Sequence, residues 1–335
     1  MEKQEYVLKT LKNGDVITVR NLQVEILDIM DEIHRICEKH NIKYCLIAGA
    51  ALGICNYNGF IPWDDDMDIC IDHKDLKKFI RALKKDLNKD FYFHCFDTDH
   101  KYNVLIPTMK IRKKNTYIEE VNVLLKNRCK GDGVFIDVVT YNGISENKFV
   151  DEMYRTSIKL LMPIMVLLDN MRINTTLLKK LVLKIADKYA KKNENSKYVS
   201  QTIAIPWEKF LHEPVFLRED VYPFKLYDFE GRKYYSYNNI EKVMKQWYGP
   251  NCLKKWNGKE YVETLPVEKR HPKHVKDINL KSDVPNKKHK SKIGIFYCVL
   301  LFLIALILFN EVSFLFLGLS LIILGMTLMY FINKN

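Results

Sequence analysis

Four aspartates directly before an apolar strand pattern constrain the fold of this chain more than any other part of its sequence. Residues 64–68 read DDDMD, and apolar and polar residues alternate from there to Ile71. Because successive side chains of a strand point to opposite faces, Asp66 and Asp68 are expected on one face. Carboxylates held this close repel one another unless a cation lies between them. The pattern predicts a strand with a divalent-cation site at its start; the alternative is a solvated acidic loop.

A third carboxylate is expected on a neighbouring strand, and Asp137 is the candidate. It lies alone within the stretch Gly133–Val139, which is rich in residues that favour strands. Lys110 and Arg112 are two positions apart, so a strand would carry both cations on one side. They are predicted to hold phosphate oxygens, and an ordinary solvated face is the alternative.

The residues before the acidic run predict a helix, a strand and a tight turn. Apolar residues recur every three or four positions from Leu22 to Cys37, which is typical of one helix face. The run Tyr44–Ala48 has strand character. Gly49 and Ala50 then open a small-residue turn at the start of a further helix, where backbone N–H groups can bind phosphate. We assign Gly49 and Ala50 to the phosphate group of a donor.

Two long uncharged runs near the C-terminus predict a membrane anchor. They are Ile293–Phe309, with 17 residues, and Val312–Ile332, with 21. A hydrocarbon core of roughly 30 Å needs about 20 helical residues, so residues 286–335 are predicted to form a transmembrane helical hairpin after a catalytic domain of residues 1–285. Lysines on both flanks place the two ends in the cytoplasm. The prediction is a two-helix cell-membrane protein with a cytoplasmic catalytic domain, and a buried soluble hairpin is the alternative.

Several other kinds of site are excluded. The eight cysteines form no C-x-x-C pair and no cluster with histidine at zinc spacing. The acidic run lacks the central Gly and distal Glu of a calcium loop. The net charge of +12 is concentrated before the apolar runs, with twelve Lys and Arg against five Asp and Glu from Lys254 to Lys292. We therefore relate this charge to the membrane and expect no nucleic-acid partner.

Taken together, these motifs resemble the LicD family, which includes bacterial phosphocholine transferases and is similar to the fukutin-related enzymes. The resemblance covers roughly residues 20–275 and is carried by Gly49–Gly53, Gly59–Asp68, Lys110–Thr116, Phe135–Asp137, Phe229–Gly231 and Tyr248–Pro250. It implies an α/β (α+β) fold of the nucleotidyltransferase type, a mixed sheet flanked by helices. Two positions depart from the family pattern. Ala50 stands where a hydroxyl residue is usual, and Asn56 stands where a basic residue is frequent.

The resemblance also implies an activity, namely phosphotransfer from CDP-choline or a related CDP-alcohol to a lipid-linked glycan or teichoic-acid precursor at the membrane. The expected cofactor is Mg²⁺, with Mn²⁺ as an alternative, because carboxylate oxygens suit these ions. The predicted metal ligands are Asp64, Asp66, Asp68 and Asp137, and the last three are also the predicted catalytic residues. Trp63 is a candidate for an aromatic contact to choline.

Two other functions stay open at this point. The same fold could transfer a nucleotide from an NTP and release pyrophosphate. The chain could also be a catalytically inactive membrane scaffold, for which the departures at Ala50 and Asn56 are the sequence argument. Release of CMP or of pyrophosphate distinguishes the two enzymatic functions.

Overall fold

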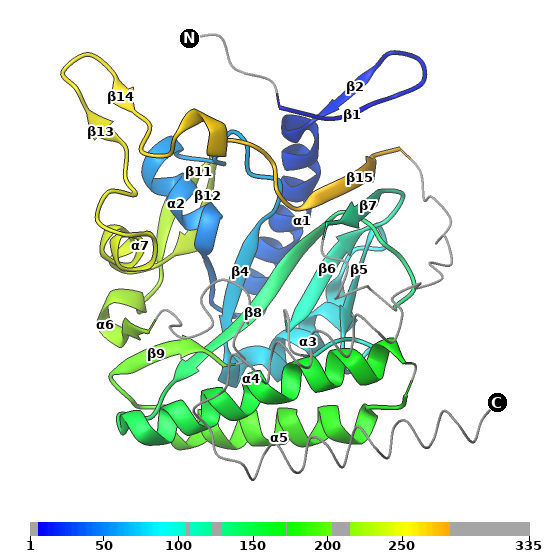
Figure 1. Cartoon of the computed structure of the whole chain (residues 1–335), viewed down its shortest axis with the longest axis vertical. Helices are drawn as coiled ribbons and strands as arrows, with labels where there is room; N and C mark the ends of the chain where they lie inside the picture. The colour runs from blue at the N-terminus through cyan, green and yellow to red at the C-terminus, as the bar shows by residue number, and fades with distance from the viewer. Residues whose placement is uncertain (1–5, 105–107, 122–128, 172, 203–214, 282–335) are drawn as a thin grey trace. The chain divides into compact units, whose positions relative to one another are not determined.

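A seven-stranded mixed sheet lies at the centre of this computed structural model (Figure 1). The structure describes residues 6–104, 108–121, 129–171, 173–202 and 215–281, to which every structural statement below refers. The strands of the sheet are β3 Tyr44–Leu46, β4 Asp68–Asp72, β5 Phe91–Cys95, β6 Met109–Lys113, β8 Phe135–Gly143, β9 Tyr198–Gln201 and β10 Phe216–Leu217. The predicted mixed sheet flanked by helices is therefore confirmed.

The long strand β8 organises this sheet. One of its edges pairs in parallel with β4, with Asp68 opposite Asp137. Its other edge pairs in antiparallel fashion with β6 through its first half and with β9 through its second half. The strands β3, β5 and β10 extend the sheet from β4, β6 and β9. The strands β4 and β6 pair with opposite edges of the same half of β8. The candidate residues Asp68, Lys110 and Asp137 therefore become neighbours.

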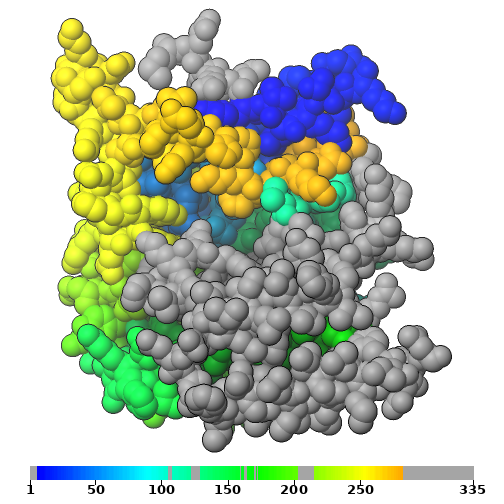
Figure 2. Space-filling model, viewed as in Figure 1, coloured from blue at the N-terminus to red at the C-terminus, as the bar shows by residue number. Residues whose placement is uncertain are grey.

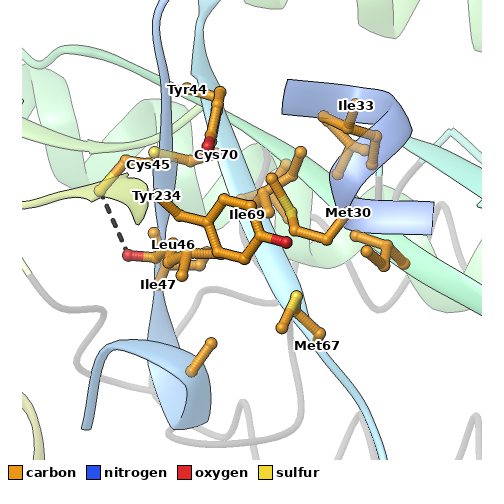
Figure 3. Close-up of a cluster of buried hydrophobic side chains, with 14 of the residues drawn as sticks. Met30, Ile33, Tyr44, Cys45, Leu46, Ile47, Met67, Ile69, Cys70 and Tyr234 are labelled. Carbon is orange, nitrogen blue, oxygen red and sulfur yellow. Dashed lines mark hydrogen bonds between the residues drawn. The ribbon is translucent and has the colours of Figure 1, made fainter. Parts of the chain in front are cut away.

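The helix α1 (Val19–Lys39) forms where the apolar periodicity predicts it. Thr18 caps its N-terminus, and its side chain accepts a hydrogen bond from the backbone of Asn21 while Asn21 bonds back to the Thr18 backbone. The predicted apolar face is buried, as shown by Met30 and Ile33, which are both 0% exposed. Figure 3 shows these two side chains close to Ile69 of β4. Burial of this stripe against the sheet supplies most of the helix's stability.

The remaining elements surround this centre. The further helices are α2 Ala48–Tyr57, η1 His73–Asp75, α3 Leu76–Asp86, α4 Lys148–Asn170, α5 Thr176–Lys192, α6 Arg218–Val221, α7 Ile240–Tyr248 and η2 Val267–Lys269. The further strands are β1 Val7–Thr10, β2 Val16–Thr18, β7 Tyr117–Glu120, β11 Lys225–Phe229, β12 Arg232–Ser236, β13 Lys255–Trp256, β14 Tyr261–Val262 and β15 Val275–Asn279. The helices α4 and α5 lie side by side, and the rings of Tyr154 and Tyr189 stack at 3.8 Å.

The strand β15 brings a late part of the chain back to the catalytic half. It pairs in antiparallel fashion with β7, and it also contacts the N-terminal strand β1. In Figure 2 the orange segment that contains β15 lies at the surface, between the blue N-terminal hairpin and the blue-green strands. More than 200 residues separate Asp65 from this segment in sequence, yet the fold places the two in contact.

The predicted transmembrane hairpin is wrong, and the fold class is corrected to the mixed α/β part alone. No helix of the described residues is long and apolar enough to cross a membrane. The longest of them, α4, includes charged residues such as Asp151 and Arg155, which are costly in a hydrocarbon core. Residues 286–335, to which the hairpin was assigned, lie outside the described residues. The predicted localisation as a two-helix membrane protein is corrected for the same reason.

Candidate active site

The strand register places two acidic side chains and one lysine in a row across three adjacent strands. Asp68 is the direct partner of Asp137 on β8, and Asp137 is the direct partner of Lys110 on β6. Directly opposed residues of paired strands point to the same face of a sheet. The Lys110 ammonium lies 2.9 Å from Oδ1 of Asp137 and 2.7 Å from Oε1 of Glu120. The structure therefore brings Asp68, Asp137 and Lys110 together.

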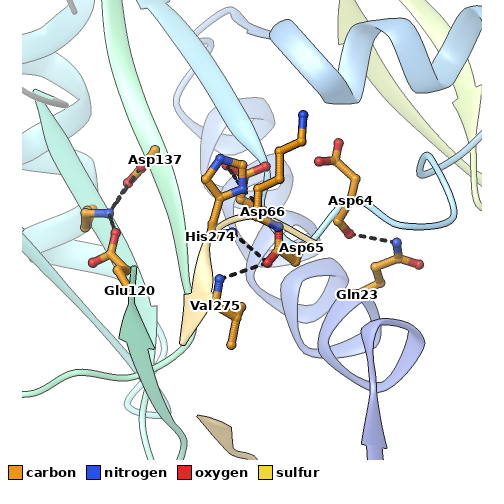
Figure 4. Close-up of polar contacts among 10 residues, drawn as sticks. Gln23, Asp64, Asp65, Asp66, Glu120, Asp137, His274 and Val275 are labelled. Atoms are coloured by element: carbon orange, nitrogen blue, oxygen red, sulfur yellow. Dashed lines mark hydrogen bonds and ion pairs between the residues drawn. The ribbon is translucent and has the colours of Figure 1, made fainter. Parts of the chain in front are cut away.

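Asp66 lies outside the strand in which the sequence analysis placed it. β4 begins at Asp68, and Asp66 belongs to the irregular segment before it. Alternation along a strand therefore does not explain the position of Asp66. Its carboxylate instead lies 3.2 Å from Nδ1 of His274, as Figure 4 shows. Burial and then the charge of Asp66 raise the pKa of Asp68, so the two carboxylates are electrostatic neighbours.

Asp64 lies against the start of α2. A Cβ atom at position 49 would overlap Oδ2 of Asp64, so a side chain there would displace this carboxylate. The backbone carbonyl of Asp64 accepts a hydrogen bond of 3.0 Å from Nε2 of Gln23, which is buried on α1 (Figure 4). Gln23 also donates to the carbonyl of Ile61. Gln23, which the sequence analysis missed, thus holds the acidic segment in place.

The first residues of α2 can offer only backbone groups to a phosphate. The side chain of Ala50 is 3% exposed and faces the core. Ala48 has a φ of +50°, a conformation that L-residues with a side chain rarely adopt. Gly49 lies at the turn between them, in contact with Asp64. These observations agree with the predicted use of backbone N–H groups at Gly49 and Ala50, which stays a prediction.

Asn56 has a structural role that explains its lack of charge. Its side-chain amide donates to the carbonyl of Cys252 at 3.1 Å, and its side-chain oxygen accepts from the N–H of Lys254 at 3.0 Å. Lys254 in turn places its ammonium 3.7 Å from the ring centroid of Tyr57. Asn56 therefore ties the end of α2 to a later segment. Loss of function is not needed to account for an uncharged residue here.

Asp65 is buried and anchors the segment before β15. Its two carboxylate oxygens accept hydrogen bonds from the backbone N–H groups of Lys273, His274 and Val275 and from the His274 ring, at 2.9 to 3.2 Å. Burial opposes ionisation, but the hydrogen bond and charge of His274 lower the pKa of Asp65. Asp65 is therefore an ionised structural residue within a run of candidate ligands.

His274 is the functional candidate that the sequence analysis missed. Burial opposes its protonation, but the Asp65 hydrogen bond and the charges of Asp66 and Asp65 raise its pKa to about 10. It therefore carries a positive charge beside the acidic segment near neutral pH. No local pattern marks this histidine, because its partners lie about 200 residues earlier in the chain.

The remaining carboxylates resist ionisation in the absence of a further cation. Burial, followed by the charge of Asp66, raises the pKa of Asp64 and of Asp68 well above the ordinary value. Burial also raises the pKa of Asp66. The pKa of Asp137 is raised by burial, against the effect of Lys110, to about 6. No hydrogen bond or ion pair joins the Asp68 carboxylate to another described residue, so its ionised form has no direct partner there.

The donor chemistry at this site fits Mg²⁺ or Mn²⁺. Among the described residues, no three or more His, Cys, Asp or Glu side chains are arranged to hold a metal ion as they stand. Mg²⁺ in phosphotransfer sites is held by one or two carboxylates together with waters and substrate phosphates. Asp66 and Asp68 supply oxygen ligands of this type beside the start of α2. The metal assignment itself stays a prediction.

Arg112 and Trp63 both have partners within the protein, and their predicted roles stay predictions. Arg112 is 1% exposed, and its guanidinium donates to the carbonyl of Gly133 at 2.7 Å, so the fold uses it in the interior. Trp63 packs edge-on against the rings of Tyr6 and Tyr57. The Arg270 guanidinium lies 5.7 Å from the Trp63 ring centroid. The aromatic group around Trp63 therefore already contacts a cation of the protein.

Comparison with known proteins gives the family and the relatives that this sequence resembles. A family model described as the LicD/FKTN/FKRP nucleotidyltransferase domain matches residues 41–155. The chain is similar to the lipopolysaccharide cholinephosphotransferase LicD of Haemophilus influenzae, with 21% identity over 289 residues that cover 78% of this chain and 97% of that protein. It is also 40% identical to an uncharacterized protein of Rickettsia typhi over 84 residues, 24% of this chain and 27% of that protein. An uncharacterized protein of Rickettsia prowazekii is 40% identical over 52 residues, 16% of this chain and 20% of that protein.

Proposed function

Because this chain belongs to the LicD family of phosphotransferases, we propose that it transfers phosphocholine from CDP-choline to a sugar hydroxyl of a cell-surface glycan or teichoic-acid precursor. CDP-ribitol and CDP-glycerol are the alternative donors. The choline donor is supported by the similarity over 97% of the length of a protein named as a cholinephosphotransferase. The single structural observation that carries the proposal is the row of Asp68, Asp137 and Lys110 across three paired strands.

The reaction joins the acceptor hydroxyl oxygen to the phosphorus of phosphocholine and breaks the bond from that phosphorus to CMP. The protein mainly positions these groups and compensates charge. Asp137 accepts the proton of the attacking hydroxyl, because a base whose pKa of about 6 lies near neutral pH is efficient. Lys110 pairs with Asp137 and favours its ionised form, which can accept the proton. The CMP leaving group carries away the electron pair of the broken bond.

A divalent ion has a defined place in this proposal. Asp66 and Asp68 would hold Mg²⁺ or Mn²⁺, and Asp64 would support it directly or through water. The bound ion supplies neutralisation of the donor diphosphate. The N–H groups at Gly49 and Ala50 orient the same diphosphate, since helix starts favour anions.

Product analysis tests the proposal. The full chain is incubated with CDP-choline, CDP-ribitol or CDP-glycerol, an acceptor extract and Mg²⁺, and CMP is measured. CMP release that requires acceptor and Mg²⁺ is expected. Release of pyrophosphate from CTP or ATP would instead establish nucleotidyl transfer.

Matched variants separate the enzyme from an inactive scaffold. Asp66→Ala and Asp68→Ala are expected to abolish CMP release, whereas Asp228→Asn removes an exposed carboxylate of β11 and should behave as wild type. The scaffold function replaces the proposal if the wild type forms no product with any donor and if cells with either active-site variant have the same phenotype as cells with the wild type.

A further inference from the structure

We propose that His274 is a positioning residue of this active site. It holds the Asp66 carboxylate in one orientation, and it belongs to a segment of residues 273–279 that we call the strap. The proposal rests on the function proposed above and adds a device that lies outside the matched residues 41–155. His274 contacts both an anchoring and a functional carboxylate, since its Nδ1 lies 2.9 Å from Asp65 and 3.2 Å from Asp66. The strap reaches the acidic segment from a distant part of the chain.

The first half of the strap is fixed by a single buried carboxylate. Three consecutive backbone N–H groups, those of Lys273, His274 and Val275, donate to Asp65, which is 2% exposed. A carboxylate that accepts this many hydrogen bonds holds its donors in one geometry. The His274 ring is therefore presented to Asp66 from a rigid backbone, although half of its side-chain surface stays exposed.

The strap also connects the acidic segment to the Lys110–Asp137 pair. Val275 is the direct partner of Glu120 in the pairing of β15 with β7. The carbonyl of His274 accepts a hydrogen bond of 2.8 Å from the N–H of Val121. Glu120 then binds Lys110, which binds Asp137. The strap thus contacts Asp65 and Asp66 on one side. On the other side it pairs with Glu120, which binds the lysine partner of Asp137.

The far end of the strap is held by ion pairs outside the site. The Lys9 ammonium lies 2.6 Å from Oδ1 of Asp277 and donates to the carbonyl of Ile278. Lys276 pairs with Glu119 at 2.6 Å. The strap is therefore attached at both ends, and a change at His274 alters how Asp66 is oriented more than whether the strap stays bound.

Catalytic carboxylates need such support, because a displacement of about 1 Å can lower a rate roughly 100-fold. Asp66 lies in an irregular segment rather than in a strand, so no strand pairing orients it. The His274 ring supplies a contact that defines one of its oxygen positions. Asp68 and Asp137 have strand pairing for the same purpose.

Three substitutions at position 274 test the proposal in the full chain. His274→Leu removes the ring donor, and His274→Asn keeps an amide donor near the position of Nδ1. His274→Gln moves the donor by one bond, and it replaces His274→Leu as the test if the leucine variant does not fold. His271→Leu is the matched control, because His271 lies just before the strap, is exposed and has no hydrogen bond or ion pair with a described residue.

Two measurements are made on each variant. The first is Mn²⁺ affinity, from the electron paramagnetic resonance signal of free Mn²⁺, and the second is the kcat and KM of CMP release. For His274→Leu we expect Mn²⁺ binding to weaken about tenfold, as for residues that orient metal ligands, and kcat to fall roughly 100-fold with little change in KM. His274→Asn should recover most of both losses, His274→Gln should recover less, and His271→Leu should match the wild type.

The outcomes separate this proposal from the function on which it rests. Wild-type Mn²⁺ affinity in a folded His274→Leu or His274→Gln variant would overturn the positioning role. An equal loss in His274→Asn and His274→Leu would also overturn it, because the donor position would then be irrelevant. If the wild type releases no CMP from any donor, the proposed function fails, while the Mn²⁺ comparison still decides the role of His274.

Discussion

Asp68 and Asp137 face each other directly in the parallel pairing of β4 and β8, and only Asp137 has a cationic partner among the described residues. The fold therefore keeps one carboxylate compensated by Lys110 and leaves its neighbour uncompensated. An arrangement of this kind lowers the stability of the protein alone and increases its affinity for a cation. Several predictions about activity and stability depend on this relationship.

Asp68→Asn is predicted to separate activity from stability. The amide removes a charge that burial and the charges of Asp66 and Asp137 make unfavourable, so the metal-free variant should have a higher Tm than the wild type at pH 7. Activity should fall at least ~100-fold, as for other losses of an electrostatic contact in an active site. Differential scanning fluorimetry without metal and CMP release with Mg²⁺ measure the two effects. A lower Tm would show that Asp68 makes a stabilising contact.

The stability of the metal-free protein is predicted to decrease as the pH rises. The pKa of Asp137 is raised by burial from 3.8 to about 6, so its stabilising effect is complete below about pH 3.8 and is lost as the pH passes 6. A shift of this size corresponds to roughly 3 kcal/mol. His274, with a pKa raised to about 10 by its aspartate partners against the effect of burial, loses its contribution between pH 6.5 and 10. Urea unfolding at pH 5, 7 and 9 measures the trend.

Saturating Mg²⁺ is predicted to flatten the acid part of this profile. A cation bound by the ionised carboxylates stabilises the state in which Asp64, Asp66 and Asp68 are deprotonated. The unfolding free energy should then change little between pH 5 and 7 with Mg²⁺, and more strongly with EDTA. The same profile in Mg²⁺ and in EDTA would argue against a cation at this site.

Lys110→Met is predicted to destabilise the fold. The variant leaves Asp137 and Glu120 without their shared cation, and the Lys110 side chain is only 12% exposed. Removing one partner of a buried ion pair destabilises by about 3–5 kcal/mol, and the partial exposure of both carboxylates reduces the expected value to about 2 kcal/mol. Lys110→Arg is the control that keeps the charge. Chemical denaturation at pH 7 measures the difference, and equal stability of both variants would contradict the prediction.

Ala48→Gly is predicted to stabilise the protein. Ala48 has a φ of +50°, where glycine avoids a strain of about 1 kcal/mol. Ala50→Gly is the matched control two residues later, inside α2, and should destabilise by roughly 0.5–1 kcal/mol. Opposite shifts of Tm for the two variants are expected. Shifts in the same direction would show that backbone conformation at position 48 does not limit stability.

The catalytic strands could be predicted from the sequence because their signals are local. Alternation after the acidic run indicated the strand that begins at Asp68, and strand-forming residues around Asp137 indicated its neighbour. The α1 face was predicted equally well, since helical periodicity needs only one segment. The predicted position of Asp66 within the strand was wrong. The length of β4 depends on its pairing with β3 and β8, which no local pattern specifies. The membrane hairpin was inferred from apolar runs that lie outside the described residues.

The sequence by itself determined the chemistry of this protein, namely a dense set of carboxylates beside apolar strands that must pack into a sheet. The tertiary structure alone decided which carboxylates are compensated and which are left with raised pKa values. Asp65 becomes an anchor because it binds His274, and Asp68 has no ion pair among the described residues because Lys110 pairs with Asp137 and Glu120 instead. Electrostatic interactions depend on distance in space, and distances between remote segments are set only when the whole chain folds.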